Sequence, residues 1–170
     1  MHPNCAAVNE ILHAAGVTGR VRLLDKAVTT ARAAAEQLGC PVGAVANSLI
    51  FETSTTASLG MREQFKETAA GPAPLLIMTS GAHRVDMNKV GEQLGCGLRR
   101  ASPAFVRVHT HQPIGGVAPV GHPRPIPTIV DRALAEFDQL WAAGGIPNAV
   151  FPLTYDELLR LTGGAEADVG

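Results

Sequence analysis

Residues 114–124 read IGGVAPVGHPR, and the rest of the predicted fold is arranged around this glycine- and proline-rich segment. Gly115 and Gly116 allow backbone conformations and close approaches that other residues forbid, whereas proline at 119 and 123 fixes its own φ angle. One interpretation is a stiff loop that holds backbone N–H groups outward, as a cradle for a carbonyl oxygen or a phosphate. The other is a tight irregular turn between two strands, because glycine and proline are also ordinary turn residues.

The composition predicts one folded domain. The chain has 170 residues, of which 46% are apolar and 17% charged, so it has enough apolar material for a core and too little charge for a disordered chain. Only 4% are aromatic, so the core is expected to consist of Ala, Val, Leu and Ile. The formal net charge of −1 gives no indication of a nucleic-acid partner, and any such contact would need a local basic patch.

The cysteines and the hydropathy pattern bear on the compartment. Cys5, Cys40 and Cys96 are widely spaced and odd in number, which argues against a disulfide framework. No run of about 18 apolar residues is present, and no basic start is followed by an apolar segment. We therefore expect a cytoplasmic protein with free thiols and no membrane contact.

Hydrophobic periodicity and capping residues define the expected elements. Thr29 or Thr30 caps one helix, with the alternative that a hydroxyl there lines a pocket; Ser102 caps another, and Thr154 with Glu157 forms a capping box. The pattern predicts helices over residues 4–15, 31–38, 85–94, 103–108 and 155–162, and strands over 21–24, 42–51, 75–79, 126–130, 140–143 and 149–153, with another short strand beginning at residue 98.

The order of these elements predicts the fold class. Helices are interspersed among the strands without a regular βαβ period, which is typical of a single α+β domain over residues 1–170 with a curved, mixed sheet. Residues 53–73 break the pattern and are interpreted as a surface insertion. Asn47 and Ser48 interrupt an otherwise apolar strand, so they either find buried partners or face a site.

Common catalytic and metal-binding motifs are absent. The sequence has no phosphate-binding GxxxxGK[ST], no GxGxxG after a strand, no HExxH and no GxSxG. His109 and His111 alternate but have no third ligand nearby, so they are weak indicators of zinc. Cys40 and Cys96 are interpreted as small packed residues rather than nucleophiles. No metal or cofactor is expected.

A series of phrases in order resembles a known family. They are TTARAAAEQLG at 29–39, VGAVANSLIF at 42–51, LLIMTSGAHRVDMNKV at 75–90, IGGVAPVGHP at 114–123, IPTIVD at 126–131 and WAAGGIPNAVFPLTYDELLRLTGG at 141–164. Together they resemble the YbaK/prolyl-tRNA-synthetase-associated family of freestanding aminoacyl-tRNA deacylases. That family has one α+β domain with a largely antiparallel, barrel-like sheet surrounded by helices. Its members hydrolyse the ester between a wrongly attached amino acid and the 3′ end of tRNA.

The resemblance also implies site residues. The family's GxxxP loop matches residues 115–119, whose amides would hold the substrate near the scissile carbonyl, and Asp131 matches an aspartate bordering the pocket. On this basis Asn47, Gly115, Gly116 and Asp131 are the expected catalytic residues. Expected substrate contacts are Thr30, Ser80, Gly81, His111, Val117, Pro119, Gly121 and His122.

Two departures from the family pattern qualify this expectation. The family usually has a lysine where this chain has Asn47, and none of Lys26, Lys66 and Lys89 lies in a matching phrase. Asparagine donates a hydrogen bond but has a shorter reach and no charge. In addition, His111 replaces the usual glycine, so its imidazole either fills part of the pocket entrance or supplies the missing donor.

The resulting hypothesis is a trans-editing hydrolase acting on a small amino acid, such as alanine or cysteine, on proline tRNA. Backbone amides would position the carbonyl, Asn47 would orient the ribose or carbonyl, and Asp131 would order water or the amino group. Because a positioned water and substrate groups suffice for an activated ester, no dedicated nucleophile is needed. The rivals are a weakened paralogue that binds aminoacyl-tRNA or a synthetase, and a small-metabolite-binding domain.

Overall fold

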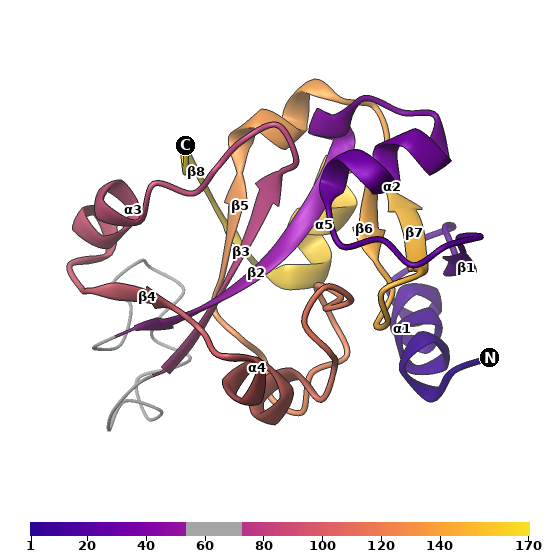
Figure 1. Cartoon of the computed structure of the whole chain (residues 1–170), viewed down its shortest axis with the longest axis horizontal. Coiled ribbons are helices and arrows are strands. Elements are labelled where there is room, and N and C mark those ends of the chain that lie inside the picture. Colours follow the sequence, from indigo (N-terminus) through magenta and orange to yellow (C-terminus); the bar gives the residue numbers. More distant parts are fainter. Residues whose placement is uncertain (54–72) are drawn as a thin grey trace.

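The computed structural model describes residues 1–53 and 73–170, so the expected surface insertion lies, except for its two end residues, outside the described part. The described chain forms one mixed sheet with helices on both faces (Figure 1). Its helices are α1 (Pro3–Ala14), α2 (Ala31–Leu38), α3 (Met87–Leu94), α4 (Pro103–Thr110) and α5 (Tyr155–Thr162). Its strands are β1 (Arg22–Leu23), β2 (Val45–Thr53), β3 (Ala73–Ser80), β4 (Leu98–Arg100), β5 (Thr128–Asp131), β6 (Leu140–Ala143), β7 (Ala149–Leu153) and β8 (Ala165–Ala167).

The sheet is open and is not closed into a barrel. Its strand order is β1-β7-β6-β2-β3-β5-β8, with β4 pairing β2 outside this path. The expectation of a single α+β domain with a mixed sheet is confirmed, whereas its barrel-like closure is corrected. The difference arises because β1 and β8 end the order without pairing each other.

The long strand β2 is the centre of the sheet, and one of its edges contains a gap. Antiparallel β3 covers residues 46–53 along one edge. On the other edge β6 pairs in parallel with Val45 and Ala46, and β4 pairs with residues 51–53. Within the described chain, residues 47–49 therefore have no strand beside them on that edge.

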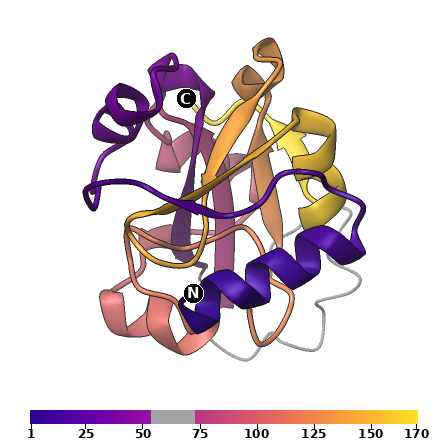
Figure 2. The ribbon, with the colours of Figure 1, turned by 90° about the vertical axis from the view of Figure 1, so that its right-hand side faces the viewer.

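Alternation along β2 separates two apolar layers. Ala46 and Ile50 pack with Val106, Leu134 and Leu158 beneath the face that α1, α4 and α5 cover. Val45 packs against α2, and Phe51 packs against α3 on the opposite face. Figures 1 and 2 show α2 and α3 separated along their face of the sheet, which leaves the middle of that face uncovered by a helix.

The predicted helix ends are confirmed where local chemistry determines them. Thr30, Ser102 and Thr154 each accept a hydrogen bond from the first turn of their helix, and Glu157 completes the capping box. β8 was not predicted, because its three residues, AEA, are too few to show a strand pattern and it forms by pairing in parallel with β5. Across residues 1–53 and 73–170, no helix combines the length and apolar character that a membrane crossing requires.

Candidate functional site

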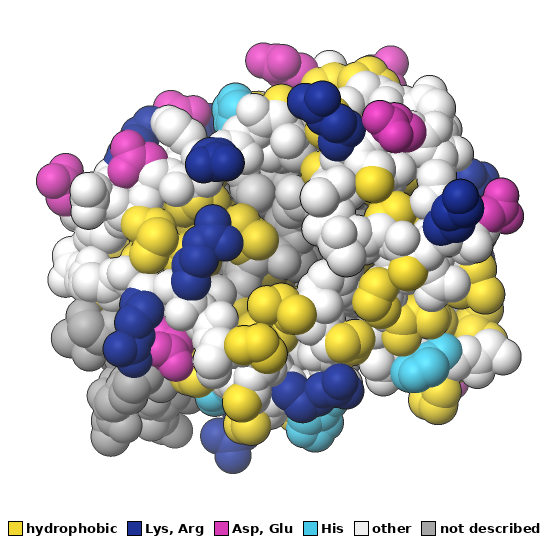
Figure 3. Space-filling model, in the orientation of Figure 1, with side chains coloured by type: hydrophobic (Ala, Val, Ile, Leu, Met, Phe, Trp, Pro, Cys, Tyr) yellow, Lys and Arg dark blue, Asp and Glu magenta, His cyan; other side chains and the backbone are white. Residues whose placement is uncertain are grey.

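A cavity of about 300 Å³ opens at the gap in β2. Its walls come from α2, β2, the loop after α4 and the β6–β7 hairpin. Figure 3 shows this face hollowed near its centre, with Lys and Arg side chains on several sides of the hollow. Asn47, Thr30, Gly115 and Val117, which the sequence singles out from distant segments, all line this one cavity.

Asn47 belongs to the cavity because of its place on β2. It alternates with Val45 and Leu49, so its side chain lies on the face that α2 and α3 partly cover. The side chain is half-buried, and within the described chain its amide makes no hydrogen bond. The sequence left open whether Asn47 is a satisfied core residue or faces a site; its position favours the site.

The main chain of Ser48 also faces the gap. The carbonyl of Ile50 accepts a hydrogen bond from the Ala101 amide on this edge. Because backbone groups alternate between edges every residue, the N–H and C=O of Ser48 point the same way. No strand lies beside them in the described structure, and Ser48 lines the cavity. These two groups are available to an extended ligand.

The two glycines of the loop have different functions in its geometry. Gly115 has a φ of +87°, a conformation that favours glycine, and open space where a Cβ would lie. Gly116 donates its N–H to the Pro113 carbonyl at 3.0 Å, and a Cβ there would lie 2.4 Å from the carbonyl carbon of Ile146. Gly116 thus allows the loop to pack against the hairpin, and its amide is engaged in the turn.

Unlike the amide of Gly116, the amides of Gly115 and Val117 are free in the described part of the chain. Neither N–H has an acceptor among the described residues, and both residues line the cavity. Gly115 is exposed, whereas the Val117 side chain is 2% exposed. The predicted amide cradle stays a prediction, and it would use the amides of Gly115 and Val117, because that of Gly116 is engaged in the turn.

Gln112 holds this loop in place, and no sequence pattern indicates this role. Its side chain is 2% exposed, accepts a hydrogen bond from the Ala118 amide at 2.7 Å and donates to the Val120 carbonyl at 3.2 Å. The Thr110 hydroxyl supports Gln112 by accepting a hydrogen bond from its main-chain N–H. A glutamine in a polar segment looks like a surface residue, so only the folded loop identifies it as a clamp.

Thr30 combines both functions that the sequence offered as alternatives. Its hydroxyl accepts a hydrogen bond from the Ala33 amide at 3.1 Å and so caps α2. The residue also lines the cavity beside Thr29 and Ala31. The N-terminal turn of α2 therefore forms one wall.

Asp131 lies at the end of β5, outside the lining of this cavity. Its carboxylate is 1% exposed and accepts from the Ser80 amide at 3.0 Å and the Ala133 amide at 3.1 Å. It also contacts Nδ1 of His83 at 3.0 Å. These contacts favour a role in joining β3, β5 and the following 3₁₀ turn, and they leave the predicted role at the ester untested.

Ser80 and Gly81 lie beside Asp131 and likewise do not line the cavity. The Ser80 hydroxyl donates to the Gly43 carbonyl at 2.8 Å. Gly81 donates to Val45, and a Cβ on Gly81 would lie 2.6 Å from the Cβ of Ala31. Ser80 therefore ties the turn after α2 to the sheet, and Gly81 allows the start of α2 to pack closely against the sheet.

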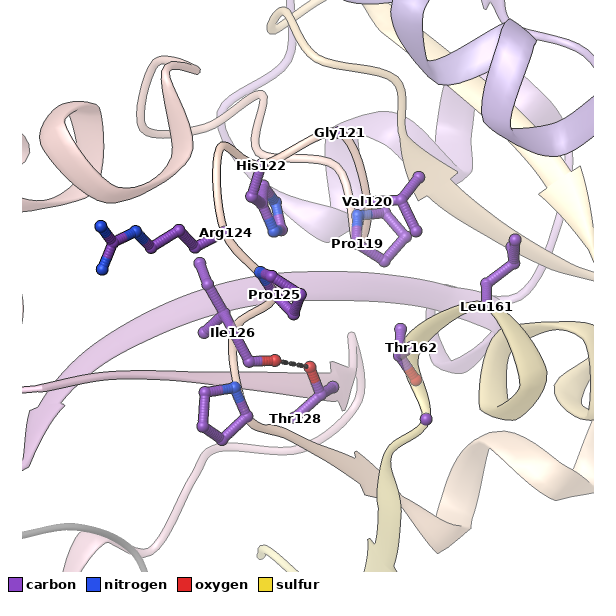
Figure 4. Close-up of a pocket in the computed structure, with 12 residues that line it drawn as sticks. Pro119, Val120, Gly121, His122, Arg124, Pro125, Ile126, Thr128, Leu161 and Thr162 are labelled. Carbon is purple, nitrogen blue, oxygen red and sulfur yellow. Dashed lines mark hydrogen bonds between the residues drawn. The ribbon is translucent and has the colours of Figure 1, made fainter. Parts of the chain in front are cut away.

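Pro119, Gly121 and His122 line a second hollow, of about 260 Å³, next to the C-terminal end of α5 (Figure 4). Nε2 of His122 lies 2.8 Å from the Ala118 carbonyl. Burial lowers the pKa of His122, and this hydrogen bond opposes the shift. The predicted substrate contacts of the glycine-rich segment are thus divided between two hollows.

His111 is placed away from both hollows. It ends α4 with a φ of +58°, and its amide donates to the Arg107 carbonyl. Its imidazole is exposed and does not line the cavity that contains Asn47. Neither predicted function of His111, filling the entrance or supplying a donor, is supported by this position.

Two further lining residues escaped sequence analysis. Trp141 forms part of the wall. The guanidinium of Arg22 lies over its ring, 4.7 Å from the ring centre. Arg100 lines the cavity from β4, in a stretch without a motif. In the described part of the chain, no three His, Cys, Asp or Glu side chains lie close enough to hold a metal ion.

Comparison with known proteins agrees with this architecture. Residues 25–161 match the aminoacyl-tRNA editing domain family. A proposed trans-editing enzyme for prolyl-tRNA synthetase is 35% identical, with 99% of this chain and 98% of that chain covered and a TM-score of 0.84. A scaffold protein used for epitope grafting is 32% identical, with the same coverage and TM-score. A hypothetical protein is 28% identical, with coverages of 96% and 98% and a TM-score of 0.79. The chain belongs to the aminoacyl-tRNA editing domain family.

Proposed function

We propose that this protein is a trans-editing deacylase that hydrolyses the ester of a small amino acid, such as alanine or cysteine, wrongly attached to proline tRNA. The observation that carries this proposal is the meeting of Asn47 and the Gly115 loop in one cavity. The similarity to the proposed prolyl-tRNA trans-editing enzyme supports the choice of tRNA. The place of action would be the cytoplasm, where tRNA is charged.

The cavity supports a small amino acid as the substrate. Its lining includes short, buried apolar side chains, among them Ala31, Ala34 and Val150. An apolar wall of this kind distinguishes substrates that differ by one methylene by roughly 1–3 kcal/mol. The side chain of the amino acid would lie against this wall, with its ester toward the loop.

The ester would be activated by main-chain and amide groups. The free N–H groups of Gly115 and Val117 would donate to the ester carbonyl, where negative charge develops during attack by water. Asn47 would orient the ribose or the carbonyl through its own amide. The Ser48 carbonyl would accept from the amino group of the substrate. Since the ester is already activated, positioning and oxyanion stabilisation provide the catalysis without a side-chain nucleophile.

A second candidate function is supported by Asn47 itself. Asn47 brings no positive charge to the cavity, so the chain could bind aminoacyl-tRNA or a synthetase without efficient hydrolysis. The fold and cavity would serve this function equally well.

A deacylation assay separates the two functions. Purified protein is incubated with proline tRNA that carries alanine, cysteine or serine. The loss of the ester is compared with its uncatalysed hydrolysis. We expect the wild type to accelerate hydrolysis of at least one ester, and Asn47→Ala to lower the rate. If the wild type is inert on all three while Asn47→Lys gains activity, the natural chain is a binding paralogue.

A further inference from the structure

We infer that Arg100 binds a phosphate group of the terminal nucleotide of the substrate at the rim of the cavity. The inference rests on the proposed function, because it assigns the substrate's phosphate to a residue of the same site.

The register of β4 directs Arg100 toward the cavity. Arg100 lies opposite Phe51 on β2, and Phe51 shares its face with Leu49 and Asn47 through alternation. The preceding residue, Arg99, lies opposite Glu52 and projects from the other face. Its guanidinium contacts the Glu52 carboxylate at 2.7 Å. The two consecutive arginines thus project from opposite faces of the sheet, and only Arg99 contacts Glu52.

Arg100 is available to an anion. It is exposed, and within the described chain its guanidinium has no ion pair or hydrogen bond. Among the described residues that line the cavity, it is the one with a charged side chain. A guanidinium presents several N–H donors in a planar fork that matches phosphate oxygens, and the pairing is charge-assisted.

The arrangement of the rim matches the chemistry of a nucleotide. Ile114 also lines the cavity, is 57% exposed and offers an apolar surface on which a base can lie. Most short apolar residues of the lining are buried and Asn47 is half-buried, whereas Gly115, Ile114 and Arg100 are solvent-exposed. An aminoacyl nucleotide placed with its side chain inside and its ester at Asn47 extends its phosphate outward, toward the exposed residues.

The test compares two stable probes that differ by one phosphate: 3′-alanylamino-3′-deoxyadenosine, in which an amide replaces the ester, and its 5′-phosphate. Their dissociation constants are measured by calorimetry at low salt for wild type, Arg100→Gln and Arg99→Gln. We expect the wild type to bind the phosphorylated probe about tenfold tighter or more, which is the lower end of a hydrogen bond to a charged group. Arg100→Gln should bring the ratio close to one, and Arg99→Gln should preserve it.

Salt provides an independent readout. The phosphate preference of the wild type should fall as salt is raised, because a charge contact is screened and displaced ions are released. Arg100→Gln should show no such dependence. Because Arg100 is exposed, its substitution should leave the unfolding midpoint close to that of the wild type, which excludes a folding defect as the cause.

The outcomes separate this inference from the proposed function. Equal binding of both probes by the wild type, or an unchanged preference in Arg100→Gln, would overturn the assignment of Arg100, even if deacylation is observed. A phosphate preference that Arg100→Gln abolishes supports the assignment, even if the wild type hydrolyses none of the three esters and the deacylase proposal fails.

Discussion

Replacing Gly116 with alanine should displace the loop that carries the free amides. The added Cβ would lie 2.4 Å from the carbonyl carbon of Ile146 and 2.6 Å from the nitrogen of Pro147. Ordinary contact begins at 3.4 Å, so the loop and the hairpin must separate by about 1 Å (3.4 minus 2.4). Both neighbours are backbone atoms, so no side-chain rotation relieves the clash.

The displacement should be transmitted to the site. The Pro147 carbonyl accepts from the Val28 amide, and the Asn148 carbonyl accepts from the Leu24 amide, so the hairpin is held by a neighbouring segment. The loop, with Gly115 and Val117, must therefore move. A misplacement of about 1 Å costs on the order of 100-fold in rate. Overpacking of this kind also costs about 1–3 kcal/mol of the free energy of unfolding.

The assay measures single-turnover hydrolysis of proline tRNA that carries alanine, at saturating enzyme concentration. Urea denaturation of the same samples measures their stability. Gly115→Ala and Gly16→Ala are matched controls for an added methyl group that meets no clash, because both positions have positive φ and empty space at the Cβ. Only Gly115 lies at the cavity. Each control should lose about 1–2 kcal/mol of stability through strain. Gly16→Ala should retain the wild-type rate. Hydrolysis by Gly116→Ala at the wild-type rate would refute the expected displacement of the loop.

Three further predictions concern the support of the site. Gln112→Leu should lower the free energy of unfolding by about 1–3 kcal/mol for each buried partner that it leaves unpaired, the Ala118 N–H and the Val120 C=O. In the same urea denaturation, replacing the exposed Gln93 by Leu should change the free energy of unfolding little. His122 has a lowered pKa in the folded protein, so the unfolded chain binds more protons and stability should fall as pH decreases through about 6.5; His122→Gln should flatten this slope in thermal unfolding between pH 8 and 5.5. Asp131→Asn should destabilise the protein by about 3 kcal/mol, because a carboxylate with several donors is lost, while the rate per folded molecule stays unchanged; a rate loss without loss of stability would instead support the predicted role at the ester.

Local chemistry explains which features could be predicted. Thr30, Ser102 and Thr154 identify helix starts because each cap needs only its own first turn. The polar Asn47 in an apolar strand left two alternatives open, a residue with buried partners or one facing a site, and the structure places it in the lining of a cavity together with Gly115.

Features that depend on tertiary contacts were missed. Arg100 reaches the cavity through its register with Phe51, which no local pattern encodes. Gly115 and His122 are close in sequence but line different hollows, because Gln112 folds the segment back on itself. Asp131 matches the family pattern, yet its oxygens are already occupied by the ends of neighbouring elements.

The gap beside residues 47–49 has a consequence for how this protein can change over evolutionary time. Ser48 contributes main-chain groups to the cavity, and these persist whatever side chain mutation places there. The half-buried Asn47 lines the cavity rather than the packed core, so its replacement leaves the pairing of β2 with β3 intact. Substitution at position 47 therefore disturbs the fold little, and the chemistry of the cavity lining can change there while the scaffold is preserved.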